Sequence, residues 1–365
     1  MGFKCGIVGL PNVGKSTLFN ALTQTAAAQA ANYPFCTIEP NVGDVAVPDP
    51  RLDQLAEIGK SAQRIPTRVN FVDIAGLVRG AAQGEGLGNQ FLANIRETDA
   101  VLYVCRCFQD PDVTHVEGRV DPLADLETVE TELMLADLES LEKRRPALEK
   151  KAKGGDKDSK ETLELVNLAL VELAAGRPAR RAKLAEDQHA AWRKLQLLTA
   201  KPVLYVCNVD EDAAGSGNAL SDAVAARAKA EGARAVAISA KIEAELALLA
   251  AEERAEYLSA MGLAEPGLDR LIRSGYDLLG LITFFTVGPK EARAWTVAKG
   301  ASAPQAAGAI HSDFERGFIR AETIAFADYL AHKGEAGARD AGRLRLEGKD
   351  YIVQDGDVMH FRFNA

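Results

Sequence analysis

The pattern of apolar and polar residues along the chain predicts six short β-strands. Each is a run of about four to eight residues that is rich in Val, Ile, Phe and Tyr. Most runs are apolar on both faces, as expected of parallel strands that helices cover on each side. The predicted strands are Lys4 to Val8, Val42 to Val47, Arg68 to Asp73, Val101 to Cys105, Val203 to Cys207 and Ala235 to Ser239.

Helical patterns alternate with these strands. They cover Thr17 to Gln29, Asn89 to Glu97 and Leu220 to Glu231. Strands that alternate with helices fold as a parallel sheet with helices on both faces. The sequence therefore predicts an α/β fold with a doubly wound sheet.

A long and mainly helical insertion interrupts this alternation. The stretch from Gly76 to Asn208 far exceeds the roughly 30 residues of one βαβ unit. Two sets of apolar residues at helical spacing predict two helices that pair as an antiparallel hairpin, with its turn at Lys150 to Lys160. The sets are Met134, Leu138 and Leu141, and Leu163, Val166, Leu170 and Leu173.

After Gly280 the pattern changes to short runs separated by glycine turns. The runs are TFFTVG, ARAWTV, RAETIAF, DYIVQ and VMHFRF, with one or two helices between them. This pattern predicts a separate small α+β domain that ends at Ala365. Its charges balance at 11 of each sign, so charge alone does not indicate a partner.

The overall charge excludes a nucleic-acid coat protein but leaves a local RNA contact open. The 365 residues suggest about two to three domains, and 47% of them are apolar, as in a packed protein. A net charge of −9 excludes a globally basic nucleic-acid coat. Lys143 to Lys160 nevertheless carries eight bases and three acids. Both a solvated helix end and an RNA-phosphate contact on a projecting arm explain this local charge.

Cysteine usage and hydropathy predict a cytoplasmic protein. The five cysteines are an odd number and occur mostly in apolar runs, which favours reduced thiols. No stretch approaches the roughly 18 apolar residues of a membrane span, so we expect no membrane partner. The first residues pass from Lys4 directly into a strand and a glycine loop, so we expect no signal peptide.

Gly9 to Ser16, with the sequence GLPNVGKS, matches the phosphate-loop pattern G-x-x-x-x-G-K-[ST] between a predicted strand and a predicted helix. The glycines allow backbone N–H groups to surround phosphates at the positive end of the helix dipole. We expect Lys15 to reach the β- and γ-phosphates and Ser16 to bind Mg²⁺. The candidate nucleotide-binding residues of this region are Asn12, Val13, Gly14, Lys15, Ser16 and Thr17.

A second motif, D-x-x-G, follows the strand that ends at Asp73. At this edge of the sheet Asp73 could hold Mg²⁺ through water, and the Gly76 N–H could meet the γ-phosphate. Alone the motif is weak, but after a phosphate loop it is specific. The glycine-rich segment from Gly76 to Gly88 predicts a switch that orders on the γ-phosphate. Thr37 is the candidate magnesium-sensing threonine.

These motifs resemble the YchF family of Obg-like, ribosome-binding ATPases. The similar segments are GLPNVGKST, NYPFCTIEPN, DIAGLVRGAAQGEGLGNQFL, KKAKGGDKD and GKDYIVQDGDVMHFRFN, and the resemblance covers essentially the whole chain. It implies an OBG-type nucleotide-binding domain at residues 1–280, interrupted at about 123–200 by a helical arm. It also implies a β-grasp (TGS) domain at residues 281–365.

The candidate base pocket departs from a guanine pattern. Guanine-specific relatives carry Asn-Lys-x-Asp after the strand that here ends in VLYVC, whereas this chain has Asn208-Val209-Asp210-Glu211. Loss of the bidentate Asp disfavours guanine, and the resemblance implies ATP. We expect the Asn208 amide to read the adenine amino group and N7, with Val209 in apolar or backbone contact. A turn cap is the alternative for Asn208, and a plain strand-to-helix turn is the alternative for Ser239.

The residues for hydrolysis are only partly present in the sequence. Leu77 follows the D-x-x-G glycine where Ras-like enzymes have a glutamine, so we expect slow intrinsic turnover. His115 matches a family histidine that would supply the missing polar contact from a loop, although a loop histidine is often incidental. The candidate catalytic residues are therefore His115, Lys15 and Gly76.

The sequence and the resemblance together predict a cytoplasmic, Mg²⁺-dependent ATPase that binds the ribosome. Its expected partners are the large subunit and the whole ribosome, with ribosomal RNA contacted by Lys143 to Lys160 and by the TGS domain. Two alternatives stay open. One is a GTPase with an unusual base pocket, and the other is a nucleotide-sensing adaptor with little catalysis.

Overall fold

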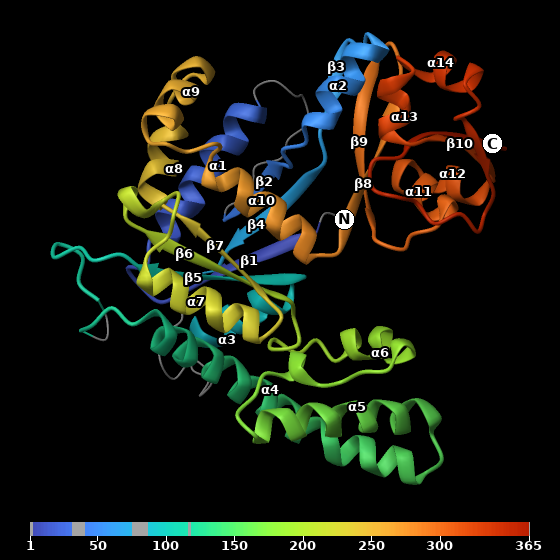
Figure 1. Cartoon of the computed structure of the whole chain (residues 1–365). Coiled ribbons are helices and arrows are strands. Elements are labelled where there is room, and N and C mark those ends of the chain that lie inside the picture. Colours follow the sequence, from blue (N-terminus) through green and yellow to red (C-terminus); the bar gives the residue numbers. More distant parts are fainter. Residues whose placement is uncertain (1–2, 31–40, 75–86, 116–117, 365) are drawn as a thin grey trace. The chain divides into compact units, whose positions relative to one another are not determined.

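The computed structural model describes residues 3–30, 41–74, 87–115 and 118–364 (Figure 1). Thr37 and Gly76 lie outside the described residues. The chain divides into two compact units. The first comprises residues 1–44 and 70–271, and the second comprises residues 45–69 and 272–365.

The first unit is built on a six-stranded sheet with the order β2-β4-β1-β5-β6-β7. β1 pairs in parallel with β4 and β5, and β6 pairs in parallel with β5 and β7. Every residue of β5 and β6 is buried, as the apolar runs predict for covered parallel strands. The strands are β1 (Lys4–Val8), β2 (Val42–Ala46), β4 (Arg68–Asp73), β5 (Ala100–Cys107), β6 (Val203–Val209) and β7 (Arg234–Ile238).

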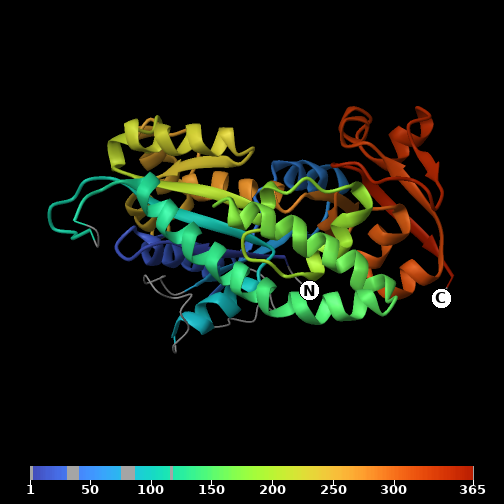
Figure 2. The same ribbon diagram turned by 90° about the horizontal axis from the view of Figure 1, so that it is seen from below.

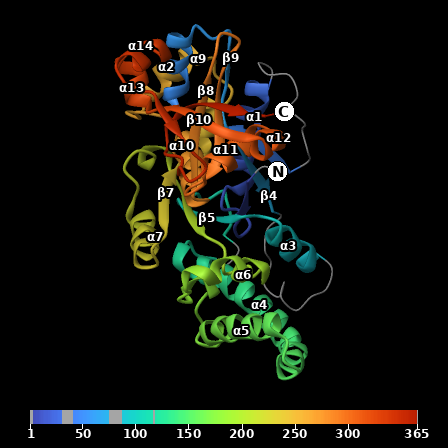
Figure 3. The same ribbon diagram turned by 90° about the vertical axis from the view of Figure 1, so that its right-hand side faces the viewer.

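Helices pack against this sheet. α1 packs with α8. α7 packs against β6 and β7, and α4 packs against β5 and α7 (Figure 3). This arrangement confirms the predicted α/β fold. The helices are α1 (Lys15–Ala30), α3 (Leu87–Arg96), α4 (Pro122–Lys153), α5 (Lys157–Ala174), α6 (His189–Lys194), α7 (Ala219–Ala230), α8 (Ala240–Leu246), α9 (Ala251–Ala260) and α10 (Gly267–Leu278), with short 3-10 turns at Ala179–Arg181, Glu186–Gln188 and Glu211–Ala213.

The predicted helical hairpin is confirmed as α4 and α5, which lie antiparallel (Figure 2). Their shared core includes Leu141, Val166 and Leu173, and the returning chain adds Trp192 to it. The helix α4 continues to Lys153, so the turn is shorter than the predicted one. No helix among the described residues is long and apolar enough to cross a membrane.

The second unit has its own six-stranded sheet, with the order β11-β10-β12-β8-β9-β3. Cores lie on both of its sides: Phe284 belongs to one and Phe285 to the other. The elements are α2 (Pro50–Gly59), β3 (Gln63–Ile65), β8 (Leu281–Val287), β9 (Glu291–Ala298), α11 (Ala303–Ile310), α12 (Ser312–Arg316), β10 (Phe318–Ile324), α13 (Phe326–Ala331), α14 (Glu335–Asp340), β11 (Arg345–Glu347) and β12 (Val358–Phe363).

Residues 45–69 belong to this second unit, which differs from the sequence-based division at residue 280. The apolar face of α2 is buried against β8 and β9 through Leu52 and Leu55. β3 extends the sheet beside β9, with Gln63 paired with Glu291. The segment follows β2 in the chain, so sequence order alone assigned it to the first domain. Burial of an apolar helix face decides its actual place.

Candidate functional site

The phosphate loop has the geometry that its sequence predicts. It connects β1 to the first turn of α1, and Gly14 has a φ of +90°, which side chains disfavour. A Cβ at Gly14 would also lie 2.1 Å from Nδ2 of Asn208. Asn12 likewise adopts a positive φ of 63°. The loop therefore curls tightly and presents backbone N–H groups at the start of a helix, as anion binding requires.

Lys15 and Asp73 meet at the phosphate end of this loop. The Lys15 ammonium pairs with Asp73 Oδ1, and both side chains are largely buried. Ile7 of β1 is in register with Asp73 of β4, which brings the two motifs to the same edge of the sheet. Ser16 follows Lys15 and is exposed. One carboxylate and one hydroxyl suit Mg²⁺, which takes hard oxygen ligands and completes its shell with phosphates and water.

Asn208 lies at the other end of the cleft and connects two loops. Its Nδ2 donates to the Val13 carbonyl at 3.0 Å, and its Oδ1 accepts from the Ala240 N–H at 2.9 Å. The residue is only 6% exposed. One Nδ2 proton and one Oδ1 lone pair remain for a ligand, which is the donor and acceptor pair that adenine N7 and the amino group need.

A cleft of about 920 Å³ is lined by Lys15, Ser16 and Asn208, but not by Asp73. It brings together most of the predicted nucleotide-binding residues, including Lys15, Asn208, Val209 and Ser239. Glu211, at the fourth position of the atypical base motif, pairs with Lys241 at 2.9 Å on the exposed rim. The Glu211 carboxylate therefore already has a cationic partner.

Several residues that line the cleft belong to none of the sequence motifs. Phe108 and Asp110 line it, together with Lys241 and Glu245. The buried Arg106 holds their loop by donating to the carbonyls of Phe108, at 3.4 Å, and Asp110, at 3.2 Å. Their position directly after β5 was the available signal, because the carboxyl ends of parallel strands carry ligand sites.

His115 does not line the cleft, although Val113, two residues before it, does. The His115 Nε2 is 2.9 Å from Oδ2 of Asp125, and the two side chains are 4% and 8% exposed. Asp125 belongs to the first turn of α4. The sequence predicts a loop histidine that can swing into the cleft, whereas here its ring is buried against the helical arm. Its catalytic role stays a prediction.

The basic arm tip, which we define as Lys143 to Lys160, presents five exposed lysines besides the exposed Lys143. Three other bases are engaged: Lys143 pairs with Glu139, Arg145 pairs with Glu149, and Arg144 donates to the Leu195 carbonyl. The exposed ammonium groups surround the turn between α4 and α5, where polyanion contacts need no desolvation of a buried group. They belong to Lys150, Lys151, Lys153, Lys157 and Lys160.

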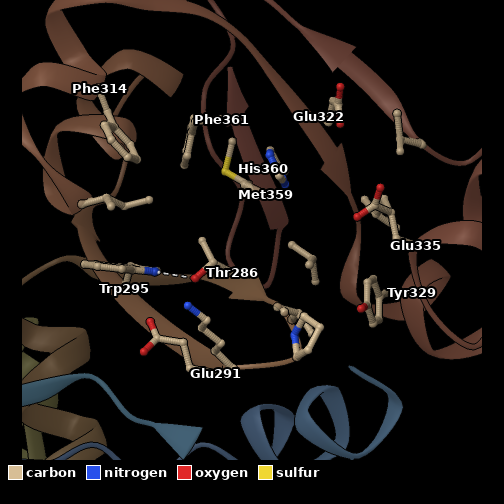
Figure 4. A pocket seen from close by; sticks show the side chains of 18 of the residues that line it. Thr286, Glu291, Trp295, Phe314, Glu322, Tyr329, Glu335, Met359, His360 and Phe361 are labelled. Atoms are coloured by element: carbon tan, nitrogen blue, oxygen red, sulfur yellow. Dashed lines mark hydrogen bonds between the residues drawn. The ribbon is translucent and has the colours of Figure 1, made fainter. Parts of the chain in front are cut away.

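A second cavity, of about 690 Å³, lies in the second unit (Figure 4). Its walls are largely apolar and aromatic, and the Trp295 Nε1–H donates to Thr286 Oγ1 at 2.9 Å. Two of its carboxylates have arginine partners, since Glu322 pairs with Arg362 and Glu335 with Arg339. The predicted site residues that the structure describes lie outside this cavity.

The phosphate loop, the Lys15 and Asp73 pair and the parallel sheet together define the class of protein: a P-loop nucleoside-triphosphatase. Residues 4–136 match the family described as "50S ribosome-binding GTPase". Residues 281–364 match the YchF-GTPase C-terminal family, described as a "protein of unknown function".

Comparisons over the full length show the family. The chain is 58% identical to the "Ribosome-binding ATPase YchF" of Haemophilus ducreyi and 54% identical to that of Bacillus subtilis, with 100% of both chains covered in each case. The structure of the Schizosaccharomyces pombe "YchF GTPase" matches with a TM-score of 0.89 and 37% identity, covering 99% of this chain and 98% of that one. This chain belongs to the YchF family, as the motifs predict.

Proposed function

We propose that this protein is a cytoplasmic, Mg²⁺-dependent ATPase that binds the ribosome and acts as a nucleotide switch in translation. The observation that carries the proposal is a cleft lined by Lys15, which pairs with Asp73, at the phosphate end and by Asn208, which joins two loops, at the base end. The names of the bacterial relatives support ATP and the ribosome. We assign residues 1–280 except 45–69, with an arm at 123–200, to the nucleotide domain. Residues 281–365, together with residues 45–69, form the proposed TGS domain.

Hydrolysis requires positioned charge and an oriented water rather than covalent chemistry by the protein. The water oxygen bonds to the γ-phosphorus while the bond to the bridging oxygen breaks, ADP leaves with the electron pair, and the water proton passes to the released phosphate. Lys15 and the loop N–H groups hold the phosphates, and the Gly76 N–H meets the γ-phosphate.

The remaining assignments concern the metal and the water. Ser16, Thr37 and Asp73 would hold Mg²⁺, which when bound neutralises charge on the phosphates. His115 provides a hydrogen bond to the attacking water and undergoes no covalent change. Because Leu77 cannot orient water, His115 must reach the cleft for each turnover, and turnover without a stimulus is slow.

The preference for adenine or guanine separates the proposed ATPase from a GTPase. The name of the fission yeast protein favours a GTPase. We expect ATP to bind at least about tenfold more tightly than GTP, because Glu211 is paired with Lys241 and guanine therefore has one charge-assisted hydrogen bond fewer. Competition against a fluorescent ATP analogue, with ATP and GTP as competitors, measures this ratio. Tighter binding of GTP would reverse the assignment.

The basic arm tip provides the proposed RNA contact. Replacing Lys150, Lys151 and Lys153 with Gln should weaken ribosome co-sedimentation and reduce the log-log salt slope by about 0.7 to 0.9 for each phosphate that is no longer neutralised. The matched control replaces Lys183, Arg193 and Lys194, which are exposed elsewhere on the insertion. Equal binding by both triple variants would exclude the tip as the RNA-binding surface. Repeating the assay without nucleotide, with ADP and with ATP distinguishes a switch from an adaptor.

A further inference from the structure

The sheet of the second unit opens between the parallel strands β8 and β12. Among the described residues, these strands are in register at Val358 and Phe285 alone, and the Phe285 N–H donates to the Asp357 carbonyl at 2.8 Å. β8 continues to Val287 and β12 continues to Phe363 beyond this pair. Both extensions line the cavity of about 690 Å³. The cavity is therefore a gap within a sheet, bounded by two strands.

The backbone of β8 presents hydrogen-bonding groups to this gap. Residues two apart in a strand direct their N–H and C=O groups to the same side, so Val287 faces β12 as Phe285 does. On the side of β9, the Gly288 N–H donates to the Glu291 carbonyl at 2.9 Å. The neighbouring pair of Val287 and Ala292 is therefore a non-hydrogen-bonded pair. In the described part of the chain, the backbone groups of Val287 thus have no partner strand.

The strand β12 presents the opposite edge of the gap. Its other edge is paired with β10 as far as Phe363. The Asp357 carbonyl is bonded to β8, so the backbone groups of Met359, Phe361 and Phe363 point to that same side. No described residue of β8 is in register with Phe361 or Phe363. Such an unpaired edge is a template for a further strand.

The two faces of the gap differ in chemistry (Figure 4). Trp295, Phe314 and Phe361 make one face apolar and aromatic. Glu322 and Glu335 lie on the other face, and their arginine partners do not line the cavity. A carboxylate accepts several hydrogen bonds, so each of them can bond to a further cation. Successive side chains of an inserted strand would meet the two faces in alternation.

We propose that this gap binds an extended segment of a partner protein in which apolar and basic residues alternate. The segment adds as a strand between β8 and β12, with its backbone bonded to Val287 and Phe361. Its apolar residues pack on Trp295, and its basic residues face Glu322 and Glu335. Main-chain hydrogen bonds supply affinity in this mode of recognition, and pockets for alternate side chains supply specificity. The gap shares no lining residue with the nucleotide cleft, so the inference is independent of the proposed ATPase activity.

The experiment measures binding of a labelled peptide to the full-length protein by fluorescence anisotropy. The peptide alternates valine and lysine over about six residues, the usual length of a strand. We expect saturable binding that N-methylation of every second peptide nitrogen weakens by at least about tenfold, because each lost hydrogen bond costs about 1 kcal/mol. Hydrogen exchange at the amides of Val287 and Phe361 should slow when the peptide binds.

Gly288→Leu tests whether the peptide enters the gap. A Cβ at Gly288 would meet only the Glu291 carbonyl, at 3.9 Å, so the protein accommodates a side chain there. The leucine would occupy space at the lining of the gap, and we expect it to weaken peptide binding by at least about tenfold. Gly348→Leu is the matched control, because a Cβ there meets nothing within 4 Å and Gly348 does not line the gap.

Glu335→Lys tests the charge of the proposed partner. Reversing this partly exposed carboxylate should weaken binding of the valine and lysine peptide by about three- to tenfold. The control is Asp350→Lys, which changes an exposed charge outside the gap and should leave the affinity within about twofold. Thermal midpoints of all variants show whether a loss of binding reflects folding.

Several results would overturn the inference. They are no binding of the peptide, equal binding of the N-methylated peptide, and equal binding by Gly288→Leu and Gly348→Leu. Tighter binding of a peptide that alternates valine with glutamate would contradict the basic partner. Sedimentation of the protein alone as a dimer that Gly288→Leu abolishes would make a second copy of this chain the occupant instead. ATP turnover of the variants tests the proposed ATPase separately.

Discussion

Lys15→Ala should abolish most nucleotide binding and turnover. The Lys15 ammonium is the cation at the phosphate end of the cleft, and it is nine-tenths buried beside Asp73. Its loss removes a charge-assisted interaction of about 1.5 to 3 kcal/mol and leaves the Asp73 carboxylate facing the phosphates without its partner. We expect affinity for ATP to fall by about 10- to 100-fold and turnover by about 100- to 1000-fold. Titration calorimetry and phosphate release measure the two effects.

A matched substitution controls for loss of charge in general. Lys229 is exposed on α7, so Lys229→Ala removes one positive charge without changing the cleft. That variant should bind ATP within about twofold of the parent, because a single exposed charge contributes little. Binding of ATP by Lys15→Ala as tightly as by the parent would refute the phosphate-loop assignment.

Glu130→Ala should destabilise the first unit by about 3 to 5 kcal/mol. The Glu130 side chain is 4% exposed and pairs with both Arg180 and Arg227. Its removal leaves two largely buried guanidinium groups that share Glu231, at 3.3 Å and 3.0 Å. Burying a charge without its partner is far more costly than losing a surface pair. Denaturant unfolding followed by circular dichroism measures the change in the free energy of unfolding.

The control for this prediction lies on the same helix. Glu139 is exposed and pairs with Lys143 one turn away, so Glu139→Ala should change stability by no more than about 0.5 kcal/mol. A loss of stability in Glu130→Ala no greater than in Glu139→Ala would show that the network does not anchor the arm.

Sequence patterns predicted the strands and motifs of the first unit closely, because these are formed by residues that are adjacent in the chain. The strand Lys4 to Val8 and the strand Arg68 to Asp73 occur with the predicted bounds. Each strand is followed directly by a motif of a few consecutive residues. The phosphate loop, with its tight turn at Gly14, is one of these motifs. Apolar periodicity likewise predicted the α4 and α5 hairpin.

The sequence patterns did not predict polar contacts between residues of different loops and helices. Asn208 bonds to Val13 across the cleft, and Glu211 has Lys241 as a partner. His115 reads as a loop residue in the sequence, yet it is buried because Asp125 of α4 folds back onto it. Hydrophobic periodicity does not indicate such a pair, because neither His115 nor Asp125 is apolar. Their spacing in the sequence does not require them to be in contact.

The amino-acid sequence by itself determined the class of fold, the family and the phosphate loop, because these depend on residues adjacent in the chain. Only the tertiary structure decided that α2 completes the second unit, that Glu130 anchors the arm and that His115 rests on Asp125. Each of these depends on which apolar face or buried charge finds a partner outside its own helix, strand or loop. Burial free energy selects that partner only when the whole chain has folded.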